Sequence, residues 1–462
     1  MKLKYTLAVG ALALTTAAQA QTWIKDTVSM GVGYANSVYY SLANGMSGAP
    51  VADNNWHFGV QALNAMADTH GGVGIWTNEA TKTGAVVKLY SLHKQGTVSF
   101  LTATAADTVG MTGAAKQLHN DTSTYAMGAF NAGATGGSNP SAGINYGWGN
   151  YSSNSQGGFP AHSVVGDSLY LLTLNQGGGM GAPATITGTY IVWPRALANG
   201  NQWTLYVKNL ATNTIDTLGV SIAGATTLFK YYNLTTKTWS DREPNKNSWD
   251  IVFSNFMDLY GTYGLQGVTG VLSNYNIKVA QADNVAPNSA DYNNFASAYS
   301  EDIHTIGSDW KTVNMTTFKY DIKANQSWFV KLSNGDIWQV YFDMFDKDAA
   351  NNQKIALQKR KVFTAPVTGI VDANQFVSNV VVAPNPVING QANLLVDAKQ
   401  TIRDAKIIIT DLSGRVVLQT TKTINAGFQQ LRLDVSSYTS GLYMVNLAGE
   451  GWNSVQKIVV RN

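Results

Sequence analysis

The chain after residue 21 consists mainly of short runs of β-branched and aromatic residues, separated by Gly, Asn and Asp. This pattern limits the possible folds more than any other feature of the sequence. Examples are residues 203–207, 327–332, 337–342 and 405–410. Long stretches of helical period are few, and runs of this composition between turn residues are typical of strands. Ser333-Asn-Gly-Asp336 joins two of the runs and predicts a hairpin turn through its Asn-Gly pair. We therefore predict an all-β protein.

The first twenty residues form a separate segment. Lys2 and Lys4 precede an apolar run, and Ala18-Gln19-Ala20 has the small-x-small pattern of a cleavage site. We expect a secretory signal peptide over 1–20, cleaved after Ala20. No later segment approaches the ~18 apolar residues that cross a bilayer. We expect a mature protein without a transmembrane segment, secreted or held at the outer-membrane surface.

The balance of charges excludes several function classes. The chain has 31 Lys+Arg against 28 Asp+Glu and no cysteine. This gives no strong source of phosphate neutralisation, so we expect no nucleic-acid partner. Disulfides, thiolate nucleophiles and Cys-type zinc sites are impossible. The four glutamates are scattered, the histidines do not fall at zinc-ligand spacing, and the common hydrolase and nucleotide motifs do not occur. We therefore predict a protein that is not an enzyme and has no catalytic or metal residues.

A β module is repeated along the chain. Val38-Tyr-Tyr-Ser-Leu42 precedes Trp56 as Lys230-Tyr-Tyr-Asn-Leu234 precedes Trp249, with 16 residues from Tyr40 to Trp56 and 17 from Tyr232 to Trp249. We predict two tandem modules, over 21–224 and 225–364. The first contains an insertion, and 15 of residues 128–188 are glycine. We expect this glycine-rich segment to be a mobile loop outside the core.

A third unit follows a linker at 365–379. It contains Pro384-Asn-Pro386, Asp411-Leu-Ser-Gly-Arg415, Gly441-Leu-Tyr443 and Lys457-Ile-Val-Val460, between apolar runs about ten residues apart. This spacing predicts a small Ig-like β-sandwich. The motifs over 380–462 resemble the type A sorting domain of type IX secretion substrates in the Bacteroidetes. That resemblance implies the type IX secretion machinery as a partner. The alternative is a fibronectin-like adhesive module.

The repeated module resembles the HmuY haemophore family, β proteins that bind haem. The carriers are Tyr231-Tyr-Asn-Leu234, Trp249-Asp-Ile-Val-Phe253, Gly267-Val-Thr-Gly270, the Trp310 segment and the hairpin from Phe329 to Phe342. The resemblance implies haem as cofactor and haem, or a haem-carrying protein, as partner. The function it implies is haem and iron acquisition. The alternative is a surface adhesin or structural β protein on the same scaffold.

The same resemblance implies an axial haem ligand five residues after the tryptophan, which is Met315 here. A thioether is a suitable ligand for haem iron. The alternative for Met315 is packing at a strand end. For the second ligand we name His304, the one imidazole of the second module, although it lies nearer Trp310 than the family pattern places it. The alternative for His304 is a solvated loop residue, and Met257 is a weaker candidate. Nearby aromatic residues could line a haem slot or fill the core: Tyr299, Trp310, Phe318, Trp328 and Trp338.

Overall fold

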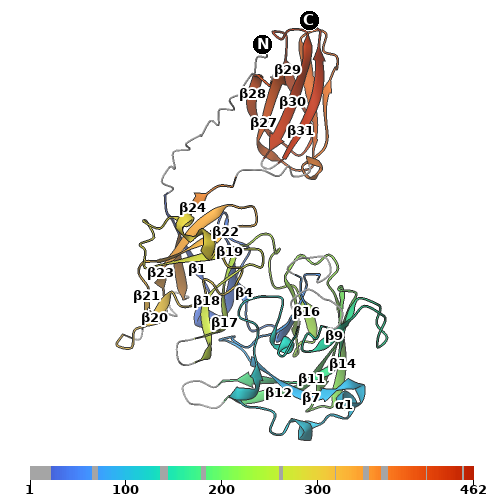
Figure 1. The fold of residues 1–462 in the computed structure, drawn as a ribbon, viewed down its shortest axis with the longest axis vertical. Coiled ribbons are helices and arrows are strands. Elements are labelled where there is room, and N and C mark those ends of the chain that lie inside the picture. The colour runs from blue at the N-terminus through green and yellow to red at the C-terminus, as the bar shows by residue number, and fades with distance from the viewer. Residues whose placement is uncertain are drawn as a thin grey trace, which may run out of the picture. The chain divides into compact units, whose positions relative to one another are not determined.

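The computed structural model describes residues 22–64, 71–135, 144–177, 184–259, 264–317, 319–346, 353–365, 373–412, 414–449 and 452–461. The predicted signal peptide lies outside the described residues. Strands dominate, and α1 (Gly96–Thr102) is the one α-helix of the described part. The all-β prediction is therefore confirmed. The chain divides into two compact units, residues 1–364 and residues 365–462 (Figure 1). Short 3-10 helices are η1 (Val32–Tyr34), η2 (Ala105–Thr108), η3 (Ala114–Lys116), η4 (Ala129–Asn131), η6 (Tyr292–Ala298) and η8 (Ala373–Gln375).

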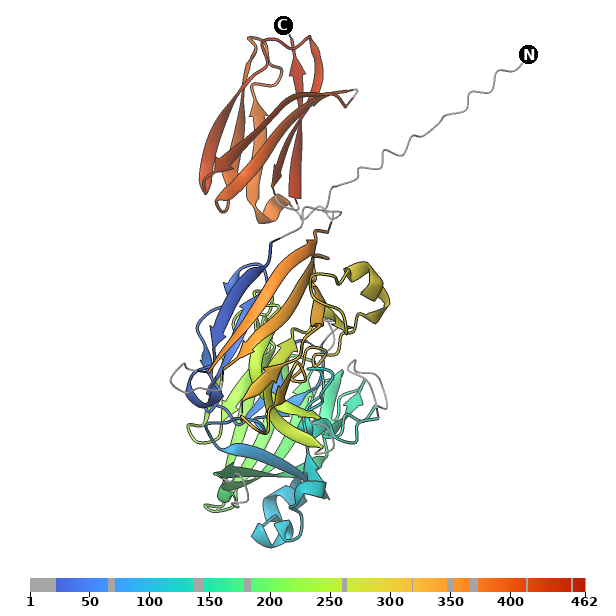
Figure 2. The same cartoon turned by 90° about the vertical axis from the view of Figure 1, so that its left-hand side faces the viewer.

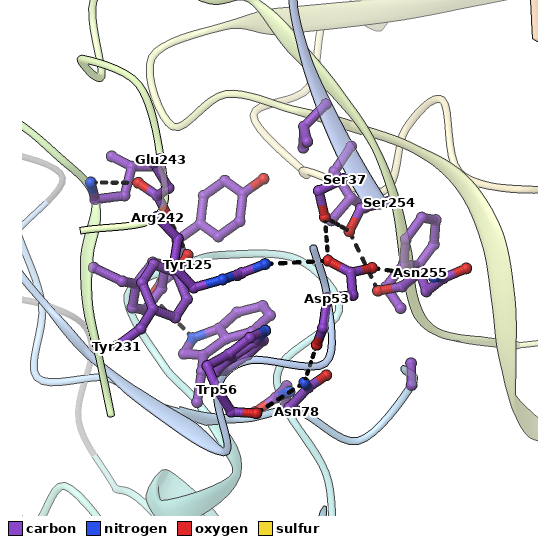
Figure 3. A pocket seen from close by; sticks show the side chains of 18 of the residues that line it. Ser37, Asp53, Trp56, Asn78, Tyr125, Tyr231, Arg242, Glu243, Ser254 and Asn255 are labelled. Carbon is purple, nitrogen blue, oxygen red and sulfur yellow. Dashed lines mark hydrogen bonds and ion pairs between the residues drawn. The ribbon is translucent and has the colours of Figure 1, made fainter. Parts of the chain in front are cut away.

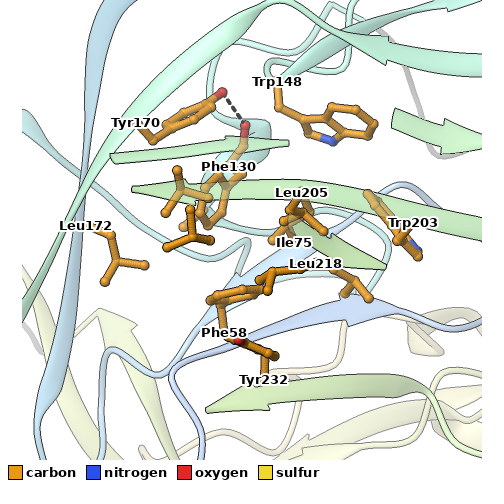
Figure 4. Close-up of a cluster of buried hydrophobic side chains, with 14 of the residues drawn as sticks. Phe58, Ile75, Phe130, Trp148, Tyr170, Leu172, Trp203, Leu205, Leu218 and Tyr232 are labelled. Carbon is orange, nitrogen blue, oxygen red and sulfur yellow. Dashed lines mark hydrogen bonds between the residues drawn. The ribbon is translucent and has the colours of Figure 1, made fainter. Parts of the chain in front are cut away.

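The first unit contains two lobes, and the first lobe is built from residues 58–240. One sheet has the order β14-β13-β12-β11-β7-β8, with β10 joined to β12 and β9 joined to β10, and the other has the order β16-β15-β5-β6. Large side chains of both sheets fill the space between them (Figure 4). The strands are β5 (Phe58–Gln61), β6 (Ile75–Thr77), β7 (Val86–Gln95), β8 (Gln117–Leu118), β9 (Gly149–Ser152), β10 (Ser163–Gly166), β11 (Ser168–Gln176), β12 (Thr185–Ala198), β13 (Gln202–Asn209), β14 (Thr214–Ser221), β15 (Phe229–Asn233) and β16 (Thr238–Ser240).

The second lobe combines the amino-terminal strands with residues 251–363. Its sheets have the orders β1-β24-β23-β22-β19 and β18-β17-β2-β3, with β4 paired to β2, and a hairpin of β20 and β21 lies beside them. The strands are β1 (Ile24–Ser29), β2 (Asn36–Ser41), β3 (Gly45–Met46), β4 (Val51–Ala52), β17 (Ile251–Leu259), β18 (Leu265–Ser273), β19 (Lys278–Asp283), β20 (Lys311–Val313), β21 (Tyr320–Ile322), β22 (Gln326–Lys331), β23 (Ile337–Phe345) and β24 (Lys354–Phe363).

The repeated motifs occupy matching positions in different lobes. Strand β2, with the first Tyr-Tyr pair, is antiparallel to β17, which follows Trp249. Strand β15, with the second Tyr-Tyr pair, is antiparallel to β5, which follows Trp56. Each Tyr-Tyr strand therefore pairs with the strand that follows the tryptophan of the other copy. The chain passes from one lobe to the other at the same point of both repeats.

This exchange differs from the tandem arrangement expected from the sequence. Three strand pairs cross the predicted boundary between residues 224 and 225: β1 with β24, β2 with β17, and β5 with β15. The boundary therefore does not separate the sheets. A repeat in the sequence shows which segments are equivalent, but contacts distant in sequence decide which copy each strand pairs with.

The glycine-rich segment is not only a surface loop. Within its described part, Phe130, Trp148 and Tyr170 are buried in the core of the first lobe. Gly166 lies so close to the carbonyl oxygen of Pro194 that a Cβ would collide with it. The glycines thus allow backbone segments to approach closely while aromatic residues between them fill the core. The expectation of a segment outside the core is wrong for these residues.

The second unit is a two-sheet sandwich, as the apolar spacing predicted. Its sheets have the orders β25-β26-β29 and β28-β27-β30-β31 around one apolar core. Figure 2 shows these strands, in orange to red, from a second side. Strand β25 begins within the stretch expected as linker. The strands are β25 (Val377–Ala383), β26 (Gln391–Ala398), β27 (Ile402–Asp411), β28 (Val416–Ile424), β29 (Gly427–Asp434), β30 (Gly441–Gly449) and β31 (Trp452–Val460).

Candidate functional site

Met315 lies in the turn between β20 and β21, and its exposed fraction is 74%. The side-chain oxygen of Asn314 accepts hydrogen bonds from the backbone N–H groups of Thr316, at 3.0 Å, and Thr317, at 3.1 Å. These bonds fix a turn that holds the methionine outward. The thioether is therefore neither packed at a strand end nor enclosed in a pocket of the described residues.

His304 lies in the loop between β19 and β20. Its side chain is 9% exposed, and its Nδ1 lies 3.5 Å from a carboxylate oxygen of Asp258. The imidazole contacts Phe256 at a ring-centroid distance of 4.6 Å. A close approach of Gly270 to the backbone of Gly307 holds the loop against β18, since a Cβ at Gly270 would collide there. The alternative of a solvated loop residue does not describe this histidine.

The structure does not bring Met315 and His304 to one site. His304 lines a cavity of about 100 Å³, and Met315 is absent from its walls. A cavity of about 150 Å³ is needed for a ligand as small as benzene. A haem held between these two side chains therefore does not fit the described residues. Trp310, Trp328 and Trp338 are core residues, at most 6% exposed, whereas Phe318 lies outside the described residues.

The cavity that His304 lines is at the junction of the two lobes, and we call it the junction cavity. Equivalent residues of the two repeats form its aromatic walls. Tyr39 packs edge-on against Trp249, with centroids 5.0 Å apart, and Tyr231 packs edge-on against Trp56, at 4.9 Å. Each pair joins the tyrosine of one repeat to the tryptophan of the other. The strand exchange between the lobes creates this arrangement.

A buried ion pair extends between these rings. Arg242 follows β16, and one of its Nη atoms lies 3.3 Å from a carboxylate oxygen of Asp53; the side chains are 4% and 7% exposed. The guanidinium lies over the rings of Tyr231 and Trp56 (Figure 3). Asp53 also accepts hydrogen bonds from the hydroxyl of Ser37, at 2.6 Å, and from the side-chain amide of Asn255, at 3.1 Å. Buried charges need such partners, and this pair has them.

Glu243 is a further acid of the junction cavity, whose walls also include Glu79, paired with His119, and Asp121. Its carboxylate accepts hydrogen bonds from the hydroxyl of Tyr231 and from the backbone N–H of Leu228, the latter at 2.7 Å. Burial raises the pKa of Glu243 to about 7, although these donors and Arg242 act in the opposite direction. The carboxyl group is therefore half protonated near neutral pH, and burial also raises the pKa of Glu79 in the same walls.

Two indole N–H groups in the walls have no hydrogen-bond acceptor in the described structure. They belong to Trp56 and Trp249, the equivalent tryptophans of the repeats. Both nitrogens are buried, and Trp249 is only 3% exposed. A buried donor without an acceptor costs about 1–3 kcal/mol. Both donors belong to residues that line the cavity.

Sequence reasoning did not select these residues as a site. Trp56 and Trp249 served only as markers of the repeat, and Asp53, Arg242 and Glu243 were not singled out. One signal was available, since the tyrosines and tryptophans that match between the copies are also those that form the walls. Their meeting depended on the strand exchange, which the spacing did not reveal.

Comparisons with known proteins identify the carboxy-terminal unit. Residues 381–461 match the family model described as secretion system C-terminal sorting domain. This is the tail of the type IX secretion system, so the protein is one that interacts with that machinery and is secreted or displayed at the cell surface. Among the described residues, no helix has the length and apolarity needed to cross a membrane.

The remaining comparisons add little. No curated protein matches the chain. The crystal structure of dimeric latent PorU from Porphyromonas gingivalis aligns with 88% of this chain and 34% of its own, at 11% identity and a TM-score of 0.16. The chain thus spans about a third of the length of that structure. At this score the likeness carries no argument.

Proposed function

We propose that this protein is exported to bind a small ligand, and that its ligand site is the junction cavity. Export is supported by the sorting domain at residues 381–461. Binding, rather than catalysis, is supported by the partners of the buried charged groups. Asp53 and Arg242 form an ion pair with each other, and Glu243 accepts hydrogen bonds from Tyr231 and Leu228. The groups left available are aromatic faces and hydrogen-bond donors, which are the usual lining of a binding pocket.

The observation that carries the proposal is the pair of unpartnered indole N–H groups. Trp56 and Trp249 occupy equivalent positions in the repeats and line one cavity from the two lobes. Each unsatisfied donor lowers the stability of the fold, and no acceptor within the described residues offsets that cost. A ligand with two acceptor atoms would satisfy both and be held between the edge-on rings of Tyr39 and Tyr231.

The chemistry of the walls favours an uncharged ligand. The ion pair leaves no net charge, burial favours the neutral forms of Glu243 and Glu79, and Glu79 is also held by His119. The volume of about 100 Å³ is smaller than a cavity that holds benzene, so it suits one polar substituent of a ligand rather than a whole ring. We therefore propose that the cavity takes an uncharged substituent with acceptor oxygens and an apolar face, such as the acetamido group of an N-acetylated sugar, while the rest of the sugar stays outside.

The test is calorimetric titration of the full mature chain with neutral monosaccharides, N-acetylated sugars included. Trp56→Phe and Trp249→Phe keep a six-membered aromatic ring but remove the pyrrole ring with its N–H, and should weaken binding by roughly tenfold. Trp338→Phe is the matched control, because its indole nitrogen is also buried without an acceptor but does not line the cavity. Absence of sugar binding, or equal affinities in all three variants, would reject the proposal.

Haem capture remains the second proposal, since the family resemblance implies it and Met315 is exposed enough to reach a ligand. The described residues do not provide His304 as its partner. Titration of the mature chain with hemin tests this proposal independently of the sugars. A sharp Soret shift that Met315→Ala weakens would support it, and an unchanged hemin spectrum would end it.

A further inference from the structure

A second hollow lies on the second lobe and shares no residue with the junction cavity. It is an open cleft of about 440 Å³, and we call it the lysine cleft. Its walls come from η1, β18, the β20–β21 hairpin and the end of β23, with one residue contributed by the loop after β6. The residues that matter for its chemistry are Tyr34, Lys82, Thr269, Lys311, Tyr320 and Phe345.

Lys311 places a titratable amine at the base of this cleft. Burial lowers its pKa to about 7, so a bound anion would favour its charged form. The residue is 6% exposed, and its ammonium donates to the carbonyl oxygens of Thr269, at 2.6 Å, and Ser308, at 3.2 Å. An ammonium has three N–H donors, so one is left over. No carboxylate of the described residues lies within 4.0 Å of its nitrogen; Asp258 and Asp309 act on it only from further away.

Lys82 adds a second cation at the rim. It is an exposed residue, and its ammonium donates to the carbonyl oxygen of Gly267 at 2.5 Å. It too lacks a carboxylate within 4.0 Å among the described residues. The two ammonium groups repel one another, and Lys82 contributes to the low pKa of Lys311, after burial as the main cause. A cleft with two like charges and no close counter-ion attracts an anion.

Aromatic rings line the cleft beside Lys311, whose ammonium nitrogen lies 4.7 Å from the ring centroid of Phe345 and 5.8 Å from that of Tyr320. The ring of Phe345 stacks on Tyr34, with centroids 5.3 Å apart and an angle of 15° between the planes, and meets Tyr320 edge-on at 4.7 Å. The hydroxyl of Tyr34 is buried and has no hydrogen-bond partner in the described part of the chain. An inorganic anion would contact the lysines alone, whereas an organic anion bound beside Lys311 would also contact these rings.

We propose that the lysine cleft binds an amphipathic organic anion, with its negative group beside Lys311 and Lys82 and its apolar body against Tyr34, Tyr320 and Phe345. The carbonyl bonds of the lysines orient their remaining N–H groups, and the ring wall supplies the apolar contact. The anion compensates a charge that the fold holds away from water. This site is independent of the neutral ligand proposed for the junction cavity.

The test uses two probes that differ in charge and share their aromatic body. The full mature chain is titrated with 8-anilinonaphthalene-1-sulfonate and with uncharged N-phenyl-1-naphthylamine, and probe fluorescence is followed. We expect saturable binding of the sulfonate at one site and much weaker binding of the uncharged probe. Lys311→Met and Lys82→Gln should each weaken sulfonate binding by roughly tenfold, the value of a charged hydrogen bond.

Lys278→Gln is the control, because it removes an exposed lysine of the same lobe that does not line the cleft. Circular dichroism establishes that each variant is folded. If Lys311→Met does not fold, Lys82→Gln at the rim decides the matter by itself. Equal affinity for the two probes, no binding of the sulfonate, or sulfonate binding that Lys82→Gln leaves unchanged would overturn the proposal.

Discussion

Replacement of Glu243 by glutamine should change how the stability of the protein depends on pH. Burial raises the pKa of Glu243 from 4.5 to about 7. Between these values the folded protein holds a proton that the unfolded chain releases, so the free energy of unfolding falls as pH rises. A shift of one pKa unit corresponds to 1.36 kcal/mol, so the free energy of unfolding of the wild type falls by about 3 kcal/mol over this pH range. The variant has no carboxyl group at this position and should not show this fall.

The measurement is urea unfolding of wild type and Glu243→Gln at a series of pH values from about 4 to about 8. Tryptophan fluorescence suits it, because eleven of the twelve tryptophans belong to the first unit. All other titrating groups are the same in the two proteins, so their contributions cancel when one free energy of unfolding is subtracted from the other. We expect this difference to shift by about 3 kcal/mol in favour of the variant as pH rises.

Glu301→Gln is the control, because Glu301 is an exposed residue whose side chain is 53% accessible in its ion pair with Lys278. Its difference from wild type should stay nearly constant across the range. If the curves of wild type and Glu243→Gln run parallel from about pH 4 to about pH 8, the carboxyl group is not buried as the structure describes. The assignment of a nearly neutral junction cavity would then fail with it.

Three further predictions follow from the fold. Fragments 22–224 and 225–364 should stay unfolded when expressed separately and gain β structure by circular dichroism when mixed, because three strand pairs cross the break; two independently folded fragments would contradict the exchange. Phe58→Ala should cost about 3–5 kcal/mol in urea unfolding, since Phe58 is fully buried between the sheets of the first lobe, and a cost below about 1 kcal/mol would argue against that packing. Removal of β25–β31 should leave the thermal unfolding of the first unit nearly unchanged while export through the type IX machinery is lost; export of the truncated protein would count against the sorting role.

Local patterns in the sequence were sufficient for the class of fold and for the secretion tail. Alternating runs and the Asn-Gly pair at 334–335 predicted strands and a hairpin, and β22 and β23 are joined there, with Gly335 at a φ of 89°. The sorting domain was found from motifs over 380–462, close to the matched residues 381–461. These features depend on neighbouring residues or on short motifs, so the sequence contains them directly.

What only the tertiary structure decided is the pairing of the repeats and the sites that this pairing creates. The sequence shows that Tyr39 and Tyr231 are equivalent, but not that each meets the tryptophan of the other copy. It also placed Met315 and His304 in one expected site, whereas the fold directs one outward and buries the other at the junction. Strand partners and side-chain directions result from contacts between residues far apart in the chain, which periodicity and spacing do not encode.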